Sequence, residues 1–265
     1  GNFDTSSIEN RLCEITEEYF KHNGLSSALE TILNQANPNF KTTDAPLPIT
    51  RELFPDNDEY LTAITKAVKA LDNSCLCIQG PPGAGKTYTA KHVISALVDQ
   101  GKRVGIMSNS HAAIINLLDP LVNSLPSIKV AKVGGMGTNQ EKYKEKYSED
   151  KYKNFSYRPS SFAKSKPYSY FQIIGATVYT FVKDFAYQDK LDYLFVDEAS
   201  QVALANLVAV SGATKNIVLM GDQMQLEQPI QGSHPEDSGA SALEFMLQGH
   251  SVIPEQKGIF LERTY

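Results

Sequence analysis

The sequence predicts an α/β protein in which a mostly parallel sheet is flanked by helices. Three short apolar runs of the type that forms buried strands occupy residues 74–78, 193–196 and 216–220. Each run ends in a glycine-rich or polar segment, and the first leads directly into a helical pattern. Strand–turn–helix order of this kind is typical of parallel sheets, whose ligand sites lie at the carboxyl ends of the strands.

Length and composition limit the class of protein. The chain has 265 residues, which suits one large α/β domain or two small ones. Apolar residues make up 42% and charged residues 21%, values typical of a globular protein. The net charge of -5 gives no chain-wide basic field for nucleic acid. The longest apolar run, 202–210, is far below the roughly 18–20 residues of a membrane span, so no membrane association is expected.

The chain has three cysteines, Cys13, Cys75 and Cys77. A disulfide scaffold needs more cysteines and an even number of them. A reducing compartment is the simpler interpretation, and a cytoplasmic location is expected. Cys75 and Cys77 lie two apart on a predicted strand without partners at metal-ligand spacing, so buried thiols are favoured over a metal site. The chain begins at Gly1 with no signal-peptide pattern, which indicates a piece of a longer protein.

Residues 1–58 are predicted to be a helical connector and linker ahead of the main domain at 59–265. Helical periodicity begins near Ser6 and again at Ser27, and Gly24 separates the two patterns. Four prolines and few periodic apolar residues follow between 37 and 58, which is typical of a linker. A scaffold role is favoured here over a partner contact.

The segment 80–87 matches the phosphate-binding pattern G-x-x-x-x-G-K-[ST] in full, after a strand and before a helix. Its glycines allow backbone amides to surround phosphate oxygens, and the following helix directs its positive end at them. Lys86 is expected to reach the β- and γ-phosphates, and the Thr87 hydroxyl to bind Mg²⁺. A chance glycine turn is disfavoured because all positions match. The predicted phosphate-site residues are Gly80, Pro81, Pro82, Gly83, Ala84, Gly85, Lys86, Thr87 and the adjacent Tyr88.

An acidic pair, Asp197 and Glu198, follows the second apolar run at the edge where such a sheet binds its ligand. Asp197 is expected to hold Mg²⁺ and Glu198 to act as the general base on the attacking water. The alternative, an exposed acidic turn, is disfavoured by the upstream phosphate loop. The third run leads into 221–226, where Gln225 is expected to join the γ-phosphate to a second ligand. The predicted catalytic residues are therefore Lys86, Glu198 and Gln225.

Segments 80–87, 197–201 and 221–226 resemble motifs I, II and III of superfamily 1 helicases, and the Asp-Glu-Ala-Ser form of motif II resembles the 5′-to-3′ branch. This resemblance implies a RecA-like P-loop NTPase domain with an N-terminal helical segment, using ATP and Mg²⁺. Ser110 and His111 resemble motif Ia, although the family favours Ser-Asn there, and Thr177 belongs to a segment resembling the next strand-contact motif. The resemblance therefore implies that all three bind nucleic acid. The segment 232–265 is similar to bacterial fusions of a RecB-like nuclease with such a helicase.

The resemblance also implies partners outside this chain: a second RecA-like domain, and a nuclease domain as a further candidate. It implies binding to single-stranded nucleic acid as well, with DNA favoured over RNA, and a role in DNA repair. The second domain normally supplies arginine fingers worth about 10³–10⁵ in rate, so this chain is expected to bind ATP but hydrolyse it poorly. Tyr265 resembles a tyrosine that stacks on the base. Counting back from Ala67 places Ile64 where the family has an adenine-reading glutamine, which leaves adenine selectivity open.

A basic, aromatic insertion is predicted at about 132–170. Within 141–170, eight lysines and arginines stand against four acidic residues, a net charge of +4, with tyrosines and phenylalanines interleaved. Basic and aromatic side chains together favour a single-strand channel, where bases stack on rings. Composition alone favours a solvated loop whose tyrosines pack locally, and the position between the two segments that resemble strand-contact motifs leaves both interpretations open.

Three functional hypotheses follow. The favoured one is the motor domain of a DNA helicase within a nuclease–helicase. The second is an RNA-acting motor of the same branch, and no reader of the 2′-hydroxyl distinguishes the two. The third is a P-loop nucleotide switch that does not translocate, which the implied nucleic-acid contacts disfavour.

Overall fold

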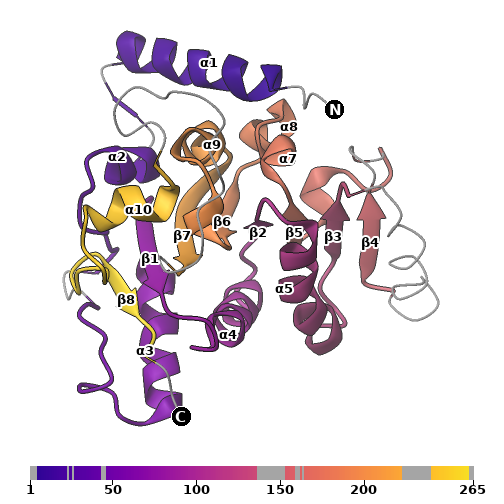
Figure 1. Ribbon diagram of the computed structural model, residues 1–265. Coiled ribbons are helices and arrows are strands. Elements are labelled where there is room, and N and C mark those ends of the chain that lie inside the picture. Colours follow the sequence, from indigo (N-terminus) through magenta and orange to yellow (C-terminus); the bar gives the residue numbers. More distant parts are fainter. Residues whose placement is uncertain are drawn as a thin grey trace.

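One parallel sheet forms the centre of the molecule (Figure 1). The computed structural model describes residues 5–22, 24–25, 27–42, 46–135, 153–158, 162, 164–222 and 240–262. Eight strands lie in the order β4-β3-β5-β2-β6-β7-β1-β8, and every neighbouring pair is parallel. The predicted α/β class with a parallel sheet is confirmed.

The three apolar runs in the sequence form β1, β6 and β7, which are neighbours in the sheet. At its carboxyl end β1 continues into the loop 80–85, and β6 continues into a short 3-10 turn at Ala199–Gln201. The strands are β1 Cys75–Gln79, β2 Val104–Met107, β3 Val130–Val133, β4 Phe155–Arg158, β5 Ile173–Ala176, β6 Leu191–Val196, β7 Thr214–Gly221 and β8 Gly258–Phe260.

Helices cover both faces of the sheet because most strands are buried on both sides. On β6, Tyr193 and Phe195 enter one core while Leu194 and Val196 enter the other. The first face carries α3 Asn57–Ala70, α4 Lys86–Val98 and α5 His111–Ser124. The opposite face carries α2 Ser27–Leu33, α7 Val178–Phe181, α8 Asp184–Gln188, α9 Leu204–Val210 and α10 Ala242–Leu247.

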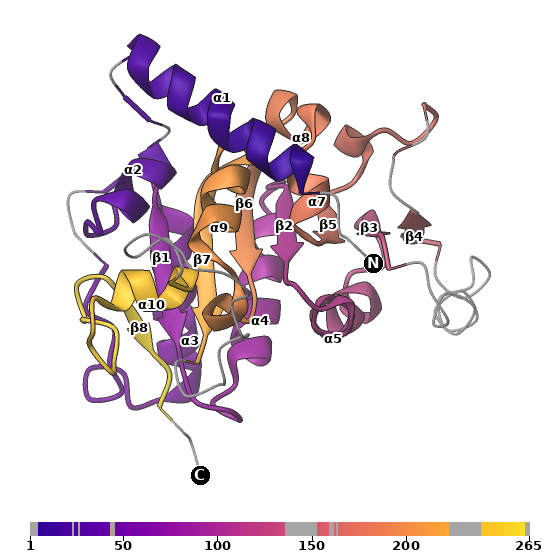
Figure 2. The same ribbon diagram turned by 45° about the horizontal axis from the view of Figure 1, so that its top comes forward.

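Helix α1, Ser6–His22, lies across α9 on the outside of the second face (Figure 2). Arg11 fixes it there: Nη2 donates to the carbonyl of Val182 (2.9 Å), and the guanidinium stacks 3.8 Å from the ring centre of Tyr187. Ile8 of α1 belongs to the same core as the strands. Residues on both sides of the predicted boundary at 58 therefore share one core, and the boundary itself stays a prediction.

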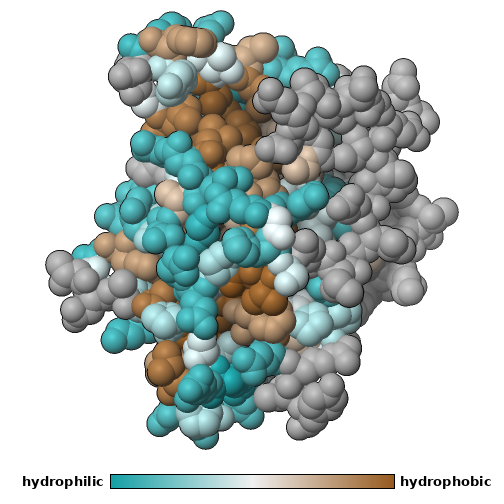
Figure 3. All heavy atoms as spheres, turned by 60° about the vertical axis from the view of Figure 1, so that its left-hand side comes forward, coloured by the Kyte–Doolittle hydropathy of each residue, from teal (hydrophilic) through white to brown (hydrophobic). Residues whose placement is uncertain are grey.

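The surface is mixed in character. None of the helices in the described ranges is long and apolar enough to cross a membrane. On the face that carries α2, α10 and β8, hydrophobic areas lie between hydrophilic ones (Figure 3). Phe20 near the end of α1 is the most exposed large apolar side chain among the described residues, at 78%.

Helix α5 approaches β5 closely at Gly175, and we expect Gly175→Ala to destabilise the protein. A Cβ at this position would lie 2.5 Å from Cδ1 of Leu118 and 2.7 Å from Cγ2 of Ile114. Overpacking of this kind costs about 1–3 kcal/mol. Urea unfolding of the variant measures the free energy of unfolding, and an unchanged midpoint would contradict the close approach of α5 to the sheet.

Candidate active site

The candidate site lies where four neighbouring strands end. Parallel strands have their carboxyl ends at one edge of the sheet, and β1, β7, β6 and β2 are consecutive neighbours. The segment 80–87 follows β1, Asp222 follows β7, the pair 197–198 follows β6, and Ser108 follows β2. The strand order therefore brings together segments that lie far apart in the sequence.

The loop 80–87 has the backbone conformation of a phosphate cradle. Gly83 and Gly85 adopt left-handed φ values of 80° and 85°, and a Cβ at either would meet no atom within 4 Å. Glycine is therefore required by the backbone angle and not by lack of space. α4, thirteen residues long, begins at Lys86 and directs its positive end at the loop.

Lys86 lies folded onto its own loop. Its Nζ donates to the carbonyl oxygens of Gly80 (2.5 Å) and Pro81 (3.0 Å). Burial lowers the pKa of Lys86, and the nearby carboxylates of Asp222 and Asp197 oppose that shift. An ammonium group in this position can exchange its carbonyl partners for phosphate oxygens without leaving the loop.

The first acidic residue after β6 is mostly buried and faces this lysine. Burial is the main reason that the pKa of Asp197 rises to about 6, and the Glu198 carboxylate adds to the rise. The backbone N–H of Glu198 donates to Oδ1 of Asp197 (3.0 Å) and, with the Lys86 ammonium, opposes the rise. A divalent cation at this point would hold the Asp197 carboxylate in its charged form.

These oxygen donors fit Mg²⁺. The Asp197 carboxylate and the Thr87 hydroxyl, on the first turn of α4, are hard ligands of the kind this ion prefers. Across the described ranges no three His, Cys, Asp or Glu side chains gather as a metal cage. Mg²⁺ characteristically takes one or two protein ligands and completes its shell with substrate phosphates and water.

The second acidic residue is hydrogen-bonded to the loop after β2. Ser108 Oγ donates to Oε2 of Glu198 (3.0 Å), and the backbone N–H of Ser110 donates to Ser108 Oγ (3.2 Å). Alongside, Nδ2 of Asn109 donates to the carbonyl of Gln201 (2.6 Å). Glu198 itself adopts a left-handed φ of 54°. Residues 108–111 follow β2 and include the predicted nucleic-acid contacts Ser110 and His111. We name them the strand loop, after the nucleic-acid strand that they are predicted to bind.

Ser108 and Asn109 were not predicted from the sequence. The Ser-Asn pair that the motif Ia resemblance favours stands at 108–109, directly after β2, and not at Ser110 and His111. Ser110 instead caps α5, because its Oγ accepts from the backbone N–H of Ala113 (3.3 Å), and His111 is the first residue of that helix. The polar pair that follows the apolar run 104–107 was the available signal.

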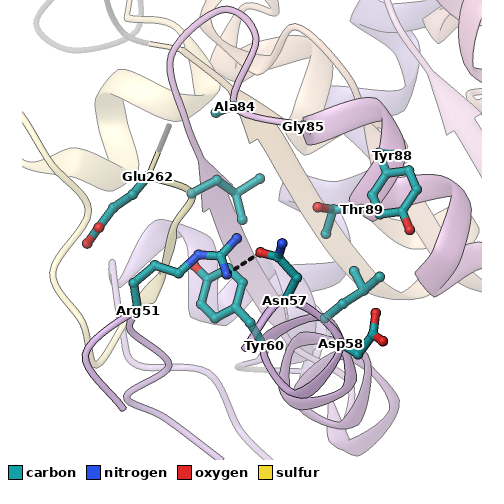
Figure 4. Close-up of a pocket in the computed structure, with 11 residues that line it drawn as sticks. Arg51, Asn57, Asp58, Tyr60, Ala84, Gly85, Tyr88, Thr89 and Glu262 are labelled. Atoms are coloured by element: carbon teal, nitrogen blue, oxygen red, sulfur yellow. Dashed lines mark hydrogen bonds between the residues drawn. The ribbon is translucent and has the colours of Figure 1, made fainter. Parts of the chain in front are cut away.

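A pocket of about 450 Å³ opens beside the phosphate loop (Figure 4). The Arg51 guanidinium lies 4.1 Å from the ring centre of Tyr60, and Nη1 donates to Oδ1 of Asn57 (2.7 Å). Tyr88, which is 65% exposed, and Glu262 line the same pocket. A pocket lined by aromatic and polar side chains next to a phosphate cradle suits a nucleotide base.

The position assigned to the adenine-reading residue is wrong. Ile64 is fully buried in the core on the sheet side of α3 and cannot face a nucleotide. Asn57 and Tyr60, from the first turn of the same helix, line the pocket instead. Counting back along the sequence placed the contact too far toward the end of α3. Gln225 and Tyr265 lie outside the described residues.

Thr177 follows β5 at the same edge and precedes α7. Ser110 and His111 stand one strand away, because β5 pairs with β2. The three predicted nucleic-acid contacts therefore share one edge of the sheet with the phosphate loop. Their contact with single-stranded nucleic acid stays a prediction.

Part of the aromatic insertion packs locally. Phe155 on β4 and Tyr168 are each 3% exposed and belong to the hydrophobic cores. Phe162 packs against Tyr168 with ring centres 5.3 Å apart, and it also contacts Phe171. Local packing is thus the correct interpretation for these aromatic residues. Residues 136–152, 159–161 and 163 of the predicted insertion lie outside the described residues.

The comparison with protein families covers most of this site but not the Arg51 side of the base pocket. The family model described as an AAA domain matches residues 64–230, more than half of the chain. The matched span includes the phosphate loop, the strand loop and the acidic pair. The chain belongs to the AAA domain family.

Relatives of this AAA domain include helicases. The chain is 27% identical over 235 residues to the DNA replication ATP-dependent helicase/nuclease DNA2 of Saccharomyces cerevisiae, covering 84% of the chain and 14% of the relative. It is 26% identical over 183 residues to the helicase/nuclease JHS1 of Arabidopsis thaliana, covering 69% and 13%. The AAA domain chain thus spans about one seventh of the length of these relatives. They support the resemblance to superfamily 1 helicases drawn from the three motifs.

Among solved structures, the AAA domain is similar to the Pif1 helicase from Candida albicans, with a TM-score of 0.39 and 17% identity over 79% of this chain and 40% of that one. A complex of an Arterivirus helicase, nonstructural protein 10, with DNA gives a TM-score of 0.42 at 18% identity, over 72% of this chain and 35% of that one.

Proposed function

We propose that this AAA domain is the ATP-binding motor domain of a superfamily 1 DNA helicase, in which ATP hydrolysis drives movement along a single strand. One observation carries the proposal: the hydrogen bond from Ser108 to Glu198, which joins the strand loop to the predicted general base. The names of the relatives, which include helicase/nucleases, support membership in a larger nuclease–helicase.

Different residues of the site bind the phosphates, the base and Mg²⁺ and activate the attacking water. The amides of 80–87 and the Lys86 ammonium hold the phosphates, and the Arg51 pocket takes the base. Asp197 and Thr87 would hold Mg²⁺, which neutralises charge on the phosphates. Glu198 orients water for attack on the γ-phosphorus and accepts its proton.

Strand binding can alter this chemistry through one hydrogen bond. A phosphodiester that contacts the strand loop displaces or fixes Ser108, and Ser108 contacts the Glu198 carboxylate directly. The same loop holds the segment after Glu198 through Asn109. Arginine fingers worth about 10³–10⁵ in rate would come from a second RecA-like domain, so slow turnover is expected of this chain alone.

Titration with a fluorescent ATP analogue tests the nucleotide site. We expect Mg²⁺-dependent binding together with turnover far slower than that of a longer protein with both RecA-like domains. Failure to bind ATP in the presence of Mg²⁺ would overturn the proposal, and rapid turnover by this chain alone would overturn the need for a second domain.

Ser108→Ala is expected to lower ATP hydrolysis about tenfold, because a hydrogen bond to a charged group is worth about 1.5–3 kcal/mol. Loss of the donor frees the Glu198 carboxylate from the strand loop. Single-turnover hydrolysis in the longer protein measures the effect, and Ser124→Ala, at the far end of α5, is the matched control. Equal rates in the two variants would show that the link does not matter.

RNA is the second candidate strand, because the chain is 30% identical over 88 residues to the putative ATP-dependent RNA helicase ECM32 of Saccharomyces cerevisiae. Competition between unlabelled DNA and RNA of one sequence for a labelled strand decides between them. A non-translocating nucleotide switch would bind neither strand. The cytoplasmic location predicted from the cysteines stays a prediction.

A further inference from the structure

A lysine is buried in the sheet beside the strand loop. Lys132 on β3 is 1% exposed, and its register partners are Gly175 on β5 and Tyr157 on β4. Its Nζ lies 2.9 Å from Nδ1 of His111. The same Nζ donates to the carbonyls of Val133 (2.8 Å) and Gly134 (3.2 Å), so all three ammonium protons have acceptors.

Among the residues that the structure describes, no carboxylate lies against the Lys132 ammonium. The titratable groups that face Lys132 from the packed elements are His111 on α5 and Tyr157 on β4, whose hydroxyl donates to the Gly134 carbonyl (2.6 Å). Burial lowers the pKa of Lys132 to about 8. An ammonium group buried without a counter-ion is costly, and an apolar side chain of similar length would avoid that cost.

The lysine decides which nitrogen of His111 carries a proton. An ammonium group can only donate, so Nδ1 of His111 accepts and Nε2 holds the ring hydrogen. Burial, with the charge on Lys132 as the second cause, lowers the pKa of His111 to about 4. The imidazole is therefore neutral at physiological pH, with a single donor on the edge away from the lysine.

The surrounding backbone fixes the ring. Gly135, at a left-handed φ of 83°, lies against the imidazole so closely that a Cβ there would be 2.9 Å from Cγ of His111. At Gly175, the lack of a side chain allows α5 to approach the sheet and bring His111 to Lys132. The described residues make no hydrogen bond to Nε2, and the ring is only half-buried.

We propose that Lys132 is a positioning residue for nucleic-acid binding, which fixes His111 as a neutral Nε2–H donor to a phosphate oxygen of a single strand. The proposal rests on the proposed function. It adds that the positive charge behind the ring belongs to a buried lysine, whereas the donor that contacts the strand is uncharged. Strand affinity at this site is then insensitive to pH while His111 stays neutral, and it falls when Lys132 loses its proton.

The sign of the pH dependence follows from the two groups. Between pH 5 and 7.5, His111 is neutral and Lys132 is charged, so the affinity is flat. Above pH 8, Lys132 loses its proton and the affinity falls. A histidine that bound phosphate as a cation would give the opposite profile, with affinity rising as the pH drops through its ordinary pKa of about 6.5.

Lys132→Met tests this proposal. Fluorescence anisotropy with a labelled single-stranded DNA measures affinity from pH 5 to 9.5 for the wild-type chain, Lys132→Met and the matched control Lys129→Met. Lys129 lies just before the same strand, and its removal takes away one charge without touching His111.

We expect the variant to bind about tenfold more weakly at pH 7.5, the effect of losing one charge-assisted contact. It also lacks the alkaline loss, because the group that would lose its proton is gone, and burial still holds the pKa of His111 below its usual range. Lys129→Met keeps the wild-type profile. An unchanged profile in Lys132→Met overturns the proposal even if strands bind well.

A measurement on the wild-type chain needs no variant. Nitrogen-15 spectra of the imidazole distinguish a protonated Nε2 from a protonated Nδ1, and we expect the Nε2–H form of His111 from pH 5 to 7.5. The Nδ1–H form, or a cationic ring at pH 6, overturns the proposal. Absence of any strand binding by a chain that still binds ATP overturns the strand-binding part of the proposed function, and this proposal with it.

Discussion

Lys86→Ala is expected to reduce ATP turnover at least about 100-fold, the size of effect found when one donor to developing charge is removed from an active site. Lys86 lies on the loop carbonyls of Gly80 and Pro81, where a phosphate oxygen can replace either partner. No other lysine occupies this loop. The variant should therefore lose both binding and hydrolysis.

Single-turnover assays and equilibrium titrations on Lys86→Ala separate these two losses. Lys91→Ala is the matched control, because Lys91 lies on the same helix, beyond its first turn. We expect the control to keep wild-type turnover. A Lys86→Ala protein that hydrolyses ATP at the wild-type rate would remove the phosphate role from the loop 80–87.

Glu198→Gln is expected to reduce hydrolysis by about 10²–10⁴ while ATP affinity changes little. The amide oxygen still accepts the Ser108 hydrogen bond, so the link to the strand loop remains, but the side chain can no longer take a proton from water. The loss should thus appear in the chemical step and not in binding.

The matched control for this variant is Asp192→Asn, a carboxylate-to-amide change near the start of the same strand. Asp192 accepts from the backbone N–H of Arg103 and from Lys215, far along β6 from the acidic pair. We expect it to hydrolyse ATP normally. Equal losses in the two variants would mean that Glu198 acts through stability and not through chemistry.

The central strands were predictable from apolar runs that end in polar segments. Residues 74–78, 193–196 and 216–220 became β1, β6 and β7 because each run is buried on both faces of a parallel sheet. β3, β4 and β8 were not predicted. β8 has only three residues, and β4 lies within the basic insertion, where composition favoured a loop.

Lys132 shows why part of the site could not be predicted from the sequence. It interrupts the apolar pattern of β3, and a lysine in a sequence is expected at the surface, so nothing in the order of residues showed its contact with His111. The base pocket was missed for a related reason. Arg51 precedes α3 and comes from the proline-rich segment predicted to be a linker, and only the fold brings it over Tyr60.

The most direct test of the account is ATP turnover by the longer protein, with both RecA-like domains, in the presence and absence of single-stranded DNA. The link from the strand loop to Glu198 predicts that the strand raises turnover at least about tenfold, consistent with one hydrogen bond to a charged group, and that Ser108→Ala reduces this stimulation. Turnover that is the same with and without DNA and RNA would contradict the motor function and leave a nucleotide switch.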